Sequence, residues 1–127
     1  MLSNLTAIPA LAVKDLAAAR EFYENVLGFS PGSETVGGVL YQAGQSQFLV
    51  YPSAYAGTNK ATALSFMASD ESFDAEVAAL RDKGIKFQTF EYEGTEWQDG
   101  VATMGDSKGV WFTDPDGNIL SVATGMS

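Results

Sequence analysis

Two stretches of the chain repeat one order of hydrophobic and polar positions. Residues 5–13 (LTAIPALAV) are apolar and predict a strand, and residues 15–28 (DLAAAREFYENVLG) then place apolar side chains three and four positions apart. That spacing predicts a helix, with Asp15 as its N-cap and Gly28 at its C-terminal end. Residues 37–53 (GGVLYQAGQSQFLVYPS) predict two strands around a turn at Gly44 and Gln45.

The second stretch follows the same order. Residues 61–69 (ATALSFMAS) predict a strand, and residues 70–84 (DESFDAEVAALRDKG) predict a helix that ends at Gly84. Residues 85–92 (IKFQTFEY) predict a further strand. Residues 109–122 (GVWFTDPDGNILSV) predict a hairpin, because Asp-Pro-Asp-Gly between two apolar runs is turn chemistry.

The repetition predicts an α+β fold built from two β-α-β-β-β modules. We expect a single domain over residues 1–127, with internal modules at 5–53 and 60–124. The stretch 89–107 fits the repeat least well. It carries five acidic residues and no Lys or Arg, and we expect it to be a strand end followed by a long loop. Long loops in compact domains are often functional.

Charge and hydropathy exclude several kinds of partner. The net charge is −9, from 16 acidic and 7 basic residues, and nucleic acids and anionic membranes both attract basic surfaces. No apolar run is long enough to cross a bilayer, and the first residues do not resemble a signal peptide. We therefore expect a cytoplasmic protein with no nucleic-acid or membrane partner.

The chain contains neither cysteine nor histidine. Their absence removes disulfides, thiolate nucleophiles, the commonest transition-metal ligand and the commonest general base near neutral pH. Asp114 and Asp116 are close acids, but the turn accounts for them, and no nucleophile lies in a recognisable pattern with a base. The sequence thus predicts no catalytic residue and no cofactor.

Two motifs carry a resemblance to a known family. VKDLAAAREFYENVLGF (residues 13–29) and GVWFTDPDGNIL (residues 109–120) resemble the vicinal oxygen chelate superfamily, which includes glyoxalase I, extradiol dioxygenases, fosfomycin resistance enzymes and bleomycin resistance proteins. The resemblance implies that paired βαβββ modules curve into a cup-shaped mixed sheet with the helices outside. AIPALAVKD (residues 7–15) is similar to the bleomycin-resistance branch, which sequesters drugs without a metal and pairs as a homodimer.

The resemblance also places the family's four metal-ligand positions. They fall on Ile8, Val50, Ala63 and Ser121. Three of these side chains cannot coordinate a metal, and a neutral serine is a poor ligand on its own. The prediction is therefore that no metal binds here.

Strand alternation extends this set. If those four positions face the cup, so do Ala10, Ala12, Phe48, Pro52, Ser65, Met67 and Ile119, while Leu11, Val13, Leu49, Leu64, Phe66, Leu120 and Val122 pack on the helices. Aromatic candidates for stacking on a ligand are Trp97, Tyr92, Tyr55 and Trp111, and Trp97 leads because it lies in the acidic loop. The predicted ligand-binding residues are Phe48, Val50, Met67, Trp97, Ser121, Tyr92, Ile8 and Ala63.

The resulting hypothesis is a metal-free small-molecule binding protein. Its ligand would be an aromatic and possibly cationic compound, such as an antibiotic or toxin, held in the cup of a homodimer. One alternative is a lyase, isomerase or dioxygenase of the same superfamily with an atypical site. A second alternative is a non-catalytic interaction domain whose cup is closed.

Overall fold

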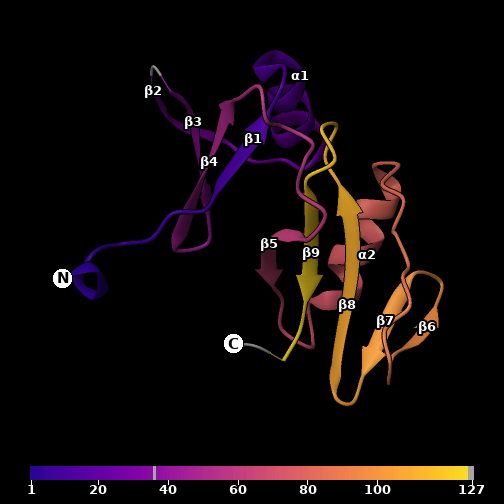
Figure 1. Cartoon of the computed structure of the whole chain (residues 1–127). Helices are drawn as coiled ribbons and strands as arrows, with labels where there is room; N and C mark the ends of the chain where they lie inside the picture. Colours follow the sequence, from indigo (N-terminus) through magenta and orange to yellow (C-terminus); the bar gives the residue numbers. More distant parts are fainter. Residues whose placement is uncertain (36, 126–127) are drawn as a thin grey trace. The chain divides into compact units, whose positions relative to one another are not determined.

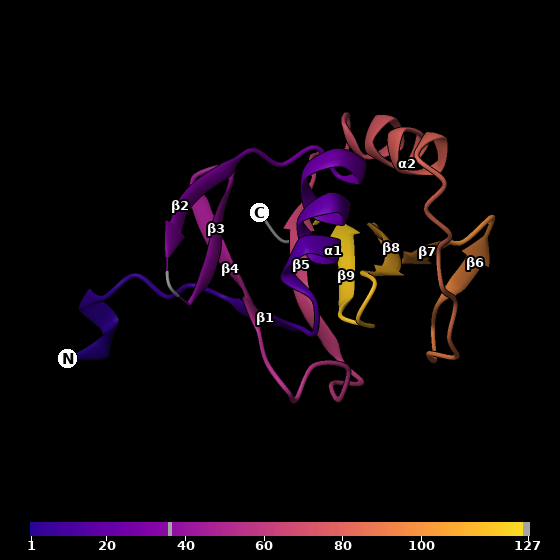
Figure 2. The same cartoon turned by 90° about the horizontal axis from the view of Figure 1, so that it is seen from above.

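The computed structural model describes residues 1–35 and 37–125, and the chain folds as two compact units. The first unit comprises Met1–Asn59 together with Pro115–Asn118, and the second runs from Lys60 to Asp114 and resumes at Ile119. Both are mixed α+β structures with one sheet each (Figures 1 and 2). Within the described residues, no helix is both long and apolar enough to span a membrane.

The first unit has the strand order β1-β4-β3-β2. After a short 3-10 helix, η1 (Leu2–Asn4), its elements are β1 (Ala10–Val13), α1 (Leu16–Arg20), the π-helical turn η2 (Glu21–Val26), β2 (Pro31–Thr35), β3 (Gly38–Ala43) and β4 (Ser46–Pro52). β1 runs parallel to β4, and the other neighbours are antiparallel.

The second unit has the strand order β5-β9-β8-β7-β6. Its elements are β5 (Thr62–Met67), α2 (Phe73–Asp82), β6 (Glu96–Gln98), β7 (Val101–Met104), β8 (Ser107–Thr113) and β9 (Ile119–Ala123). β5 is parallel to β9, and the rest of the sheet is antiparallel. α2 lies along one face of this sheet (Figures 1 and 2).

Several predicted boundaries are confirmed. The side chain of Asp15 accepts hydrogen bonds from the backbone N–H groups of Ala17 at 2.9 Å and Ala18 at 3.3 Å, as an N-cap does. Gly28 and Gly84 have φ angles of 83° and 84°, the left-handed conformation typical of a residue that ends a helix. The β3–β4 turn and the β8–β9 hairpin also form where they are predicted.

Four element predictions are wrong. The first strand begins at Ala10 rather than at residue 5, and β2 was not predicted because all five of its residues are exposed and show no alternation. Residues 85–92 form only an isolated bridge, between Gln88 and Trp111. The expected loop instead holds β6 and β7, joined at Asp99 and Gly100, whose positive φ angles of 52° and 81° close a tight turn.

The core of the first unit is aromatic. The ring of Tyr23 lies 5.8 Å from those of Tyr41 and Phe48, and Phe29 packs on Phe48 at 5.2 Å in an edge-to-face arrangement. Tyr23, Tyr41 and Phe48 are at most 1 % exposed. The four rings supply both the apolar area and the preferred ring geometry that stabilise this packing.

This packing corrects the predicted direction of two side chains in β4. Phe48 and Val50, expected to line a cup, are 1 % and 0 % exposed and lie on the core face. Val50 pairs in register with Leu11 and Val39, which are also buried. Both faces of β4 carry apolar residues, so the alternation of the sequence does not decide which face is buried. The structure shows that Phe48 and Val50 face the core, where the sequence pattern predicted Leu49.

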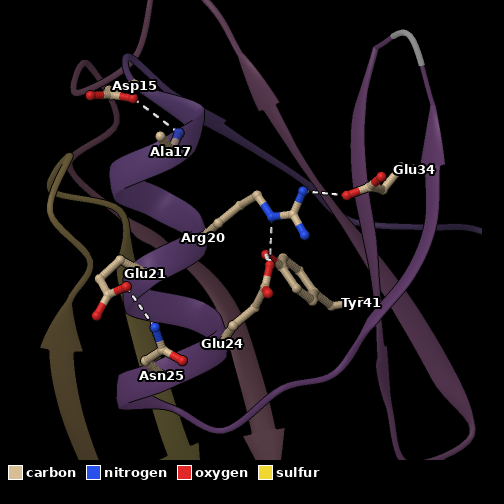
Figure 3. A network of polar contacts seen from close by, with 8 residues as sticks. All are labelled: Asp15, Ala17, Arg20, Glu21, Glu24, Asn25, Glu34 and Tyr41. Carbon is tan, nitrogen blue, oxygen red and sulfur yellow. Dashed lines mark hydrogen bonds and ion pairs between the residues drawn. The ribbon is translucent and has the colours of Figure 1, made fainter.

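A charged network borders the aromatic core. Arg20 Nε pairs with Glu24 Oε2 at 2.7 Å, and its Nη1 pairs with Glu34 (Figure 3). The buried Tyr41 hydroxyl donates a hydrogen bond of 2.8 Å to the same Glu24 oxygen. The hydrogen bond from Arg20 is the main cause that lowers the pKa of Glu24. Burial, followed by the hydrogen bond to Glu24, raises the pKa of Tyr41, so this hydroxyl keeps its proton and remains a donor.

We predict that Tyr41→Phe lowers the free energy of unfolding at pH 7 by about 1–2 kcal/mol, because it deletes a hydrogen bond to a charged acceptor and keeps the ring. Glu24 has a folded-state pKa below its usual value of 4.5. Its charged partnerships therefore stabilise the fold above that value and are lost as the pH falls through the folded pKa. Chemical denaturation at several pH values should show the difference from wild type shrinking as the solution is acidified.

Tyr55→Phe is the matched control, since Tyr55 is 80 % exposed and lies outside the network. A loss in Tyr41→Phe that is the same at pH 7 and pH 3 would show that the hydroxyl does not act through the Glu24 carboxylate.

Candidate functional site

The eight predicted ligand-binding residues divide between the two units. Ile8, Phe48 and Val50 belong to the first unit, and Ala63, Met67, Tyr92, Trp97 and Ser121 belong to the second. Ile8 precedes β1 and is 42 % exposed, whereas Phe48 and Val50 are sealed in the core. The accessible candidates therefore concentrate in the second unit, and the site is built from that unit alone.

The sheet of the second unit has two chemically different faces. Val110, Phe112, Leu120 and Val122 are at most 7 % exposed and alternate along β8 and β9. Phe112 contacts the ring of Phe87, over which the guanidinium of Arg81 in α2 lies at 5.4 Å, so these residues face α2. Successive side chains of a strand point to opposite faces. We call the face turned away from the helix the α2-distal face.

Two cross-strand rows make up the centre of the α2-distal face. Trp111 pairs with Ser121, which pairs with Ser65. In the neighbouring row the partners are Trp97, Ala102, Gly109, Ala123 and Met67. Directly opposed residues share a face, so the register places Trp97, Ser121 and Met67 on the same face of the sheet, with Met67 and Trp97 on its two edge strands. Ala63 lies at the irregularity between Thr62 and Leu64 in β5.

Trp111 has a fixed position on this face. A Cβ added at Gly109 would lie 3.0 and 3.2 Å from two carbons of the indole six-membered ring, so the ring lies directly over this glycine. The indole Nε1 donates to Thr62 Oγ1 at 3.2 Å. Trp111, one of the aromatic candidates from the sequence, is half-buried on the α2-distal face. Gly109 and Thr62 together fix the position of its ring on this face.

Trp111 is the centre of an aromatic cluster formed by Phe90, Tyr92, Trp97 and Trp111. The ring of Phe90 lies 5.0 Å from Trp111 and 5.2 Å from Trp97, and the two tryptophans are 5.9 Å apart. Tyr92 joins at 6.4 Å from Phe90. Phe90 and Tyr92 remain 42 % and 64 % exposed. A cluster of large rings with this much exposure marks an interaction surface.

An open hollow of about 730 Å³ adjoins the cluster. It is lined by the segment Thr89–Glu93, Thr95 and Trp97. Glu91 and Glu93 in its wall are exposed, and residues 89–107 contain no basic side chain. The hollow therefore combines aromatic faces with uncompensated negative charge, the combination that attracts a planar cation.

The predicted site lacks several residues of this hollow, Phe90 and Thr95 among them. The sequence pattern places Phe90 in a strand, although its position directly before an acidic loop could have marked it. The sequence does not single out Thr95, whose buried Oγ1 has no hydrogen-bond partner among the described residues. Tyr55, an aromatic candidate from the sequence, lies in the first unit at 80 % exposure, outside the cluster.

The donor set does not fit a metal. Of the four positions indicated by the family resemblance, Ile8, Val50 and Ala63 have no donor atom, and Ser121 has one neutral hydroxyl. The one-residue correction in β4 replaces Val50 by Leu49 or Tyr51 and adds no strong ligand. Within residues 1–35 and 37–125, no three acidic, histidine or cysteine side chains converge as a metal site would require.

Asp116 and Asn118 of the hairpin turn have structural roles. Asp116 Oδ1 accepts from the backbone N–H of Lys14 at 3.0 Å, and Asn118 Nδ2 donates to the carbonyl of Ala12 at 2.8 Å. The turn Pro115–Asn118 is thereby part of the first unit. Gly117 has a φ of 87°, as turn chemistry requires. These contacts account for the turn motif without a catalytic role.

We predict that Gly109→Ala displaces the indole of Trp111, because the new methyl group would lie too close to the ring. The near-ultraviolet circular dichroism of the Trp97–Trp111 pair should change, while the far-ultraviolet spectrum stays that of the folded protein. Gly37→Ala is the matched control, since a Cβ there would meet only Thr35 Oγ1 at 3.7 Å. Unchanged near-ultraviolet spectra in Gly109→Ala would contradict the close approach of the ring to Gly109.

Comparisons with known proteins agree with this architecture. The chain resembles the crystal structure of a glyoxalase/bleomycin resistance protein/dioxygenase from Alicyclobacillus acidocaldarius with a TM-score of 0.71 at 16% identity, covering 98% of this chain and 93% of that one. The fosfomycin resistance protein FosX of Listeria monocytogenes matches with a TM-score of 0.69 at 13% identity, covering 95% of this chain and 93% of that one. A lactoylglutathione lyase of Agrobacterium tumefaciens matches with a TM-score of 0.67 at 21% identity, covering 95% of this chain and 94% of that one.

At these identities the solved structures show a shared fold. No curated protein sequence matches the chain. A family model does match, over residues 6–122, which is nearly the whole sequence. With two mixed α+β units, each of which has its first and last strands parallel, this match shows that the chain belongs to the Glyoxalase/Bleomycin resistance protein/Dioxygenase superfamily.

Proposed function

We propose that this protein captures a planar aromatic cation, such as an antibiotic or toxin, without the help of a metal. The observation that carries the proposal is the aromatic cluster of Phe90, Tyr92, Trp97 and Trp111 beside an acidic hollow. Stacking on such rings contributes about 0.5–2 kcal/mol. Each nearby exposed carboxylate adds about 1 kcal/mol at low salt and less at high salt.

The residues favour capture over catalysis. The family's metal positions offer a single neutral hydroxyl, and Asp116 of the hairpin turn accepts a hydrogen bond from the backbone of Lys14. Three of the similar structures carry the name of fosfomycin resistance proteins, and at 13% identity they support an antibiotic as the ligand class only through their fold. The lyase among the similar structures supports the enzymatic alternative only through its fold, and fold alone does not determine function.

The test uses the protein's own fluorescence. The chain has two tryptophans, and both lie in the aromatic cluster. We predict that 1-methylquinolinium, a planar aromatic cation, quenches this fluorescence saturably and binds equally well with and without EDTA. Binding should weaken at high ionic strength, because the acidic hollow attracts the cation through solvent. Trp97→Ala should weaken binding in isothermal titration about tenfold, which corresponds to roughly 1.4 kcal/mol.

Tyr55→Ala is the control for this experiment, because Tyr55 is an exposed aromatic residue of the first unit. It should bind like wild type. Loss of binding on addition of EDTA would contradict metal-free capture, and equal affinities of Trp97→Ala and wild type would show that the cluster is not the site. Failure of the probe to bind wild-type protein would overturn the proposal.

We also propose that the chain pairs as a homodimer, as the resemblance to the bleomycin-resistance branch implies. Apolar side chains near the N-terminus support this assembly: Met1, Leu2, Leu5 and Ile8 are between 42 % and 100 % exposed, and a partner chain would remove them from water. Light scattering at micromolar concentration should give about twice the chain mass of 13.5 kDa. A mass of 13.5 kDa would contradict the dimer.

A further inference from the structure

Two serine hydroxyls meet on the α2-distal face, between the edge strand β5 and its neighbour β9. Ser65 Oγ and Ser121 Oγ are 2.5 Å apart, and the two residues are direct cross-strand partners in β5 and β9. Ser121 is 2 % exposed, whereas Ser65 is exposed. We propose that this serine pair presents one hydroxyl proton, that of Ser65, to a carbonyl oxygen of the bound ligand. The inference rests on the proposed function and names the ligand class more closely, as a planar aromatic cation that carries a carbonyl group.

The direction of the hydrogen bond follows from burial. Either hydroxyl could donate to the other, and the one that accepts keeps a proton for a further partner. If Ser65 donated, the proton of Ser121 would be left without a partner inside the protein, because the part of the chain that the structure describes offers Ser121 Oγ no second hydrogen bond. A buried unsatisfied donor is costly. Ser121 therefore donates to Ser65, and the free proton is on the exposed residue.

The pair is also primed as a donor. A hydroxyl that accepts one hydrogen bond becomes a better donor in the next, because hydrogen bonds in a chain polarise one another. Ser121 thus acts as a positioning residue, which fixes the oxygen of Ser65 and makes the Ser65 hydroxyl a stronger hydrogen-bond donor. Ser65 is the residue that would contact the ligand.

The location of the pair matches a ligand stacked on the indole. Trp111, Ser121 and Ser65 lie in one row across β8, β9 and β5, and neighbouring strands are about 4.8 Å apart. A bicyclic ring placed on the Trp111 face therefore directs substituents along this row toward Ser65. A carbonyl group on the ring would accept a hydrogen bond from the Ser65 hydroxyl. With an unsubstituted ring, this hydroxyl would donate to water instead.

The test compares matched probes. We would titrate the protein with 1-methylquinolinium and with its 3-, 4- and 6-carboxamide derivatives, which add a carbonyl to the same cation in three directions. Wild-type protein should bind at least one carboxamide about fivefold more tightly than the parent, the gain expected of one hydrogen bond. Ser65→Ala should remove this preference, so that the favoured carboxamide binds no better than the parent. Ser121→Ala should reduce the preference, because Ser65 loses its orienting partner.

Ser46→Ala is the control, since Ser46 is an exposed strand serine of the first unit whose hydroxyl donates to the Ala43 carbonyl. It should keep the full preference. If wild type prefers none of the carboxamides, or if the preference survives in Ser65→Ala, the role of the serine pair is wrong while capture of the cation stands. If wild type binds none of the four probes, the proposed function itself fails, and this inference fails with it.

Discussion

Burial of alternate side chains against α2 is the constraint on which the site depends. Val110, Phe112, Leu120 and Val122 must leave water together, and the two paired strands that carry them have a fixed register. Because strand side chains alternate, the residues between them are forced onto the opposite face. Trp111 and Ser121 thus owe their position to the core behind them. A slip of one residue would bury Ser121 and Trp111 against the helix and would expose the four core residues of β8 and β9.

The two units use aromatic residues differently. The first encloses Tyr23, Tyr41 and Phe48 between helix and sheet and satisfies the buried hydroxyl of Tyr41 through Glu24. The second buries Phe73 and Phe112 with aliphatic residues in its core and places its two tryptophans on the other face of its sheet. Large apolar rings outside a core need a further reason to be there. Gly109 is further evidence, because a glycine in the middle of β8 gives up a packing side chain and leaves space for the Trp111 ring.

Membership of the superfamily does not determine the chemistry of this chain. The four metal-ligand positions that the family resemblance implies hold three apolar residues and one serine here. A sheet face without charged metal-ligating side chains avoids the free-energy cost of holding like charges close together. Hydroxyl groups on such a face can form hydrogen bonds with each other. The Ser65–Ser121 pair is such an arrangement. A scaffold that serves metal chemistry elsewhere in the superfamily is thereby suited to recognition through stacking and hydrogen bonding.

The sequence by itself determined the elements whose signals are local. The N-cap at Asp15, the helix ends at Gly28 and Gly84 and the Asp114–Gly117 turn depend on residues adjacent in the chain, so local chemistry was enough to find them. The absence of histidine and cysteine likewise limits the chemistry without any structure.

Only the tertiary structure decided the features that depend on distant residues. Leu49 and Val50 are both apolar, and only the position of Tyr23 and Leu11 shows which of the two faces the core. The strands β6 and β7 form through pairing with each other and with β8. Segments of three and four residues are too short to show the apolar alternation that would predict them. The aromatic cluster joins residues from 90 to 111 that share no sequence motif. Pairing register and packing bring these residues together, and neither is encoded in any short segment of the chain.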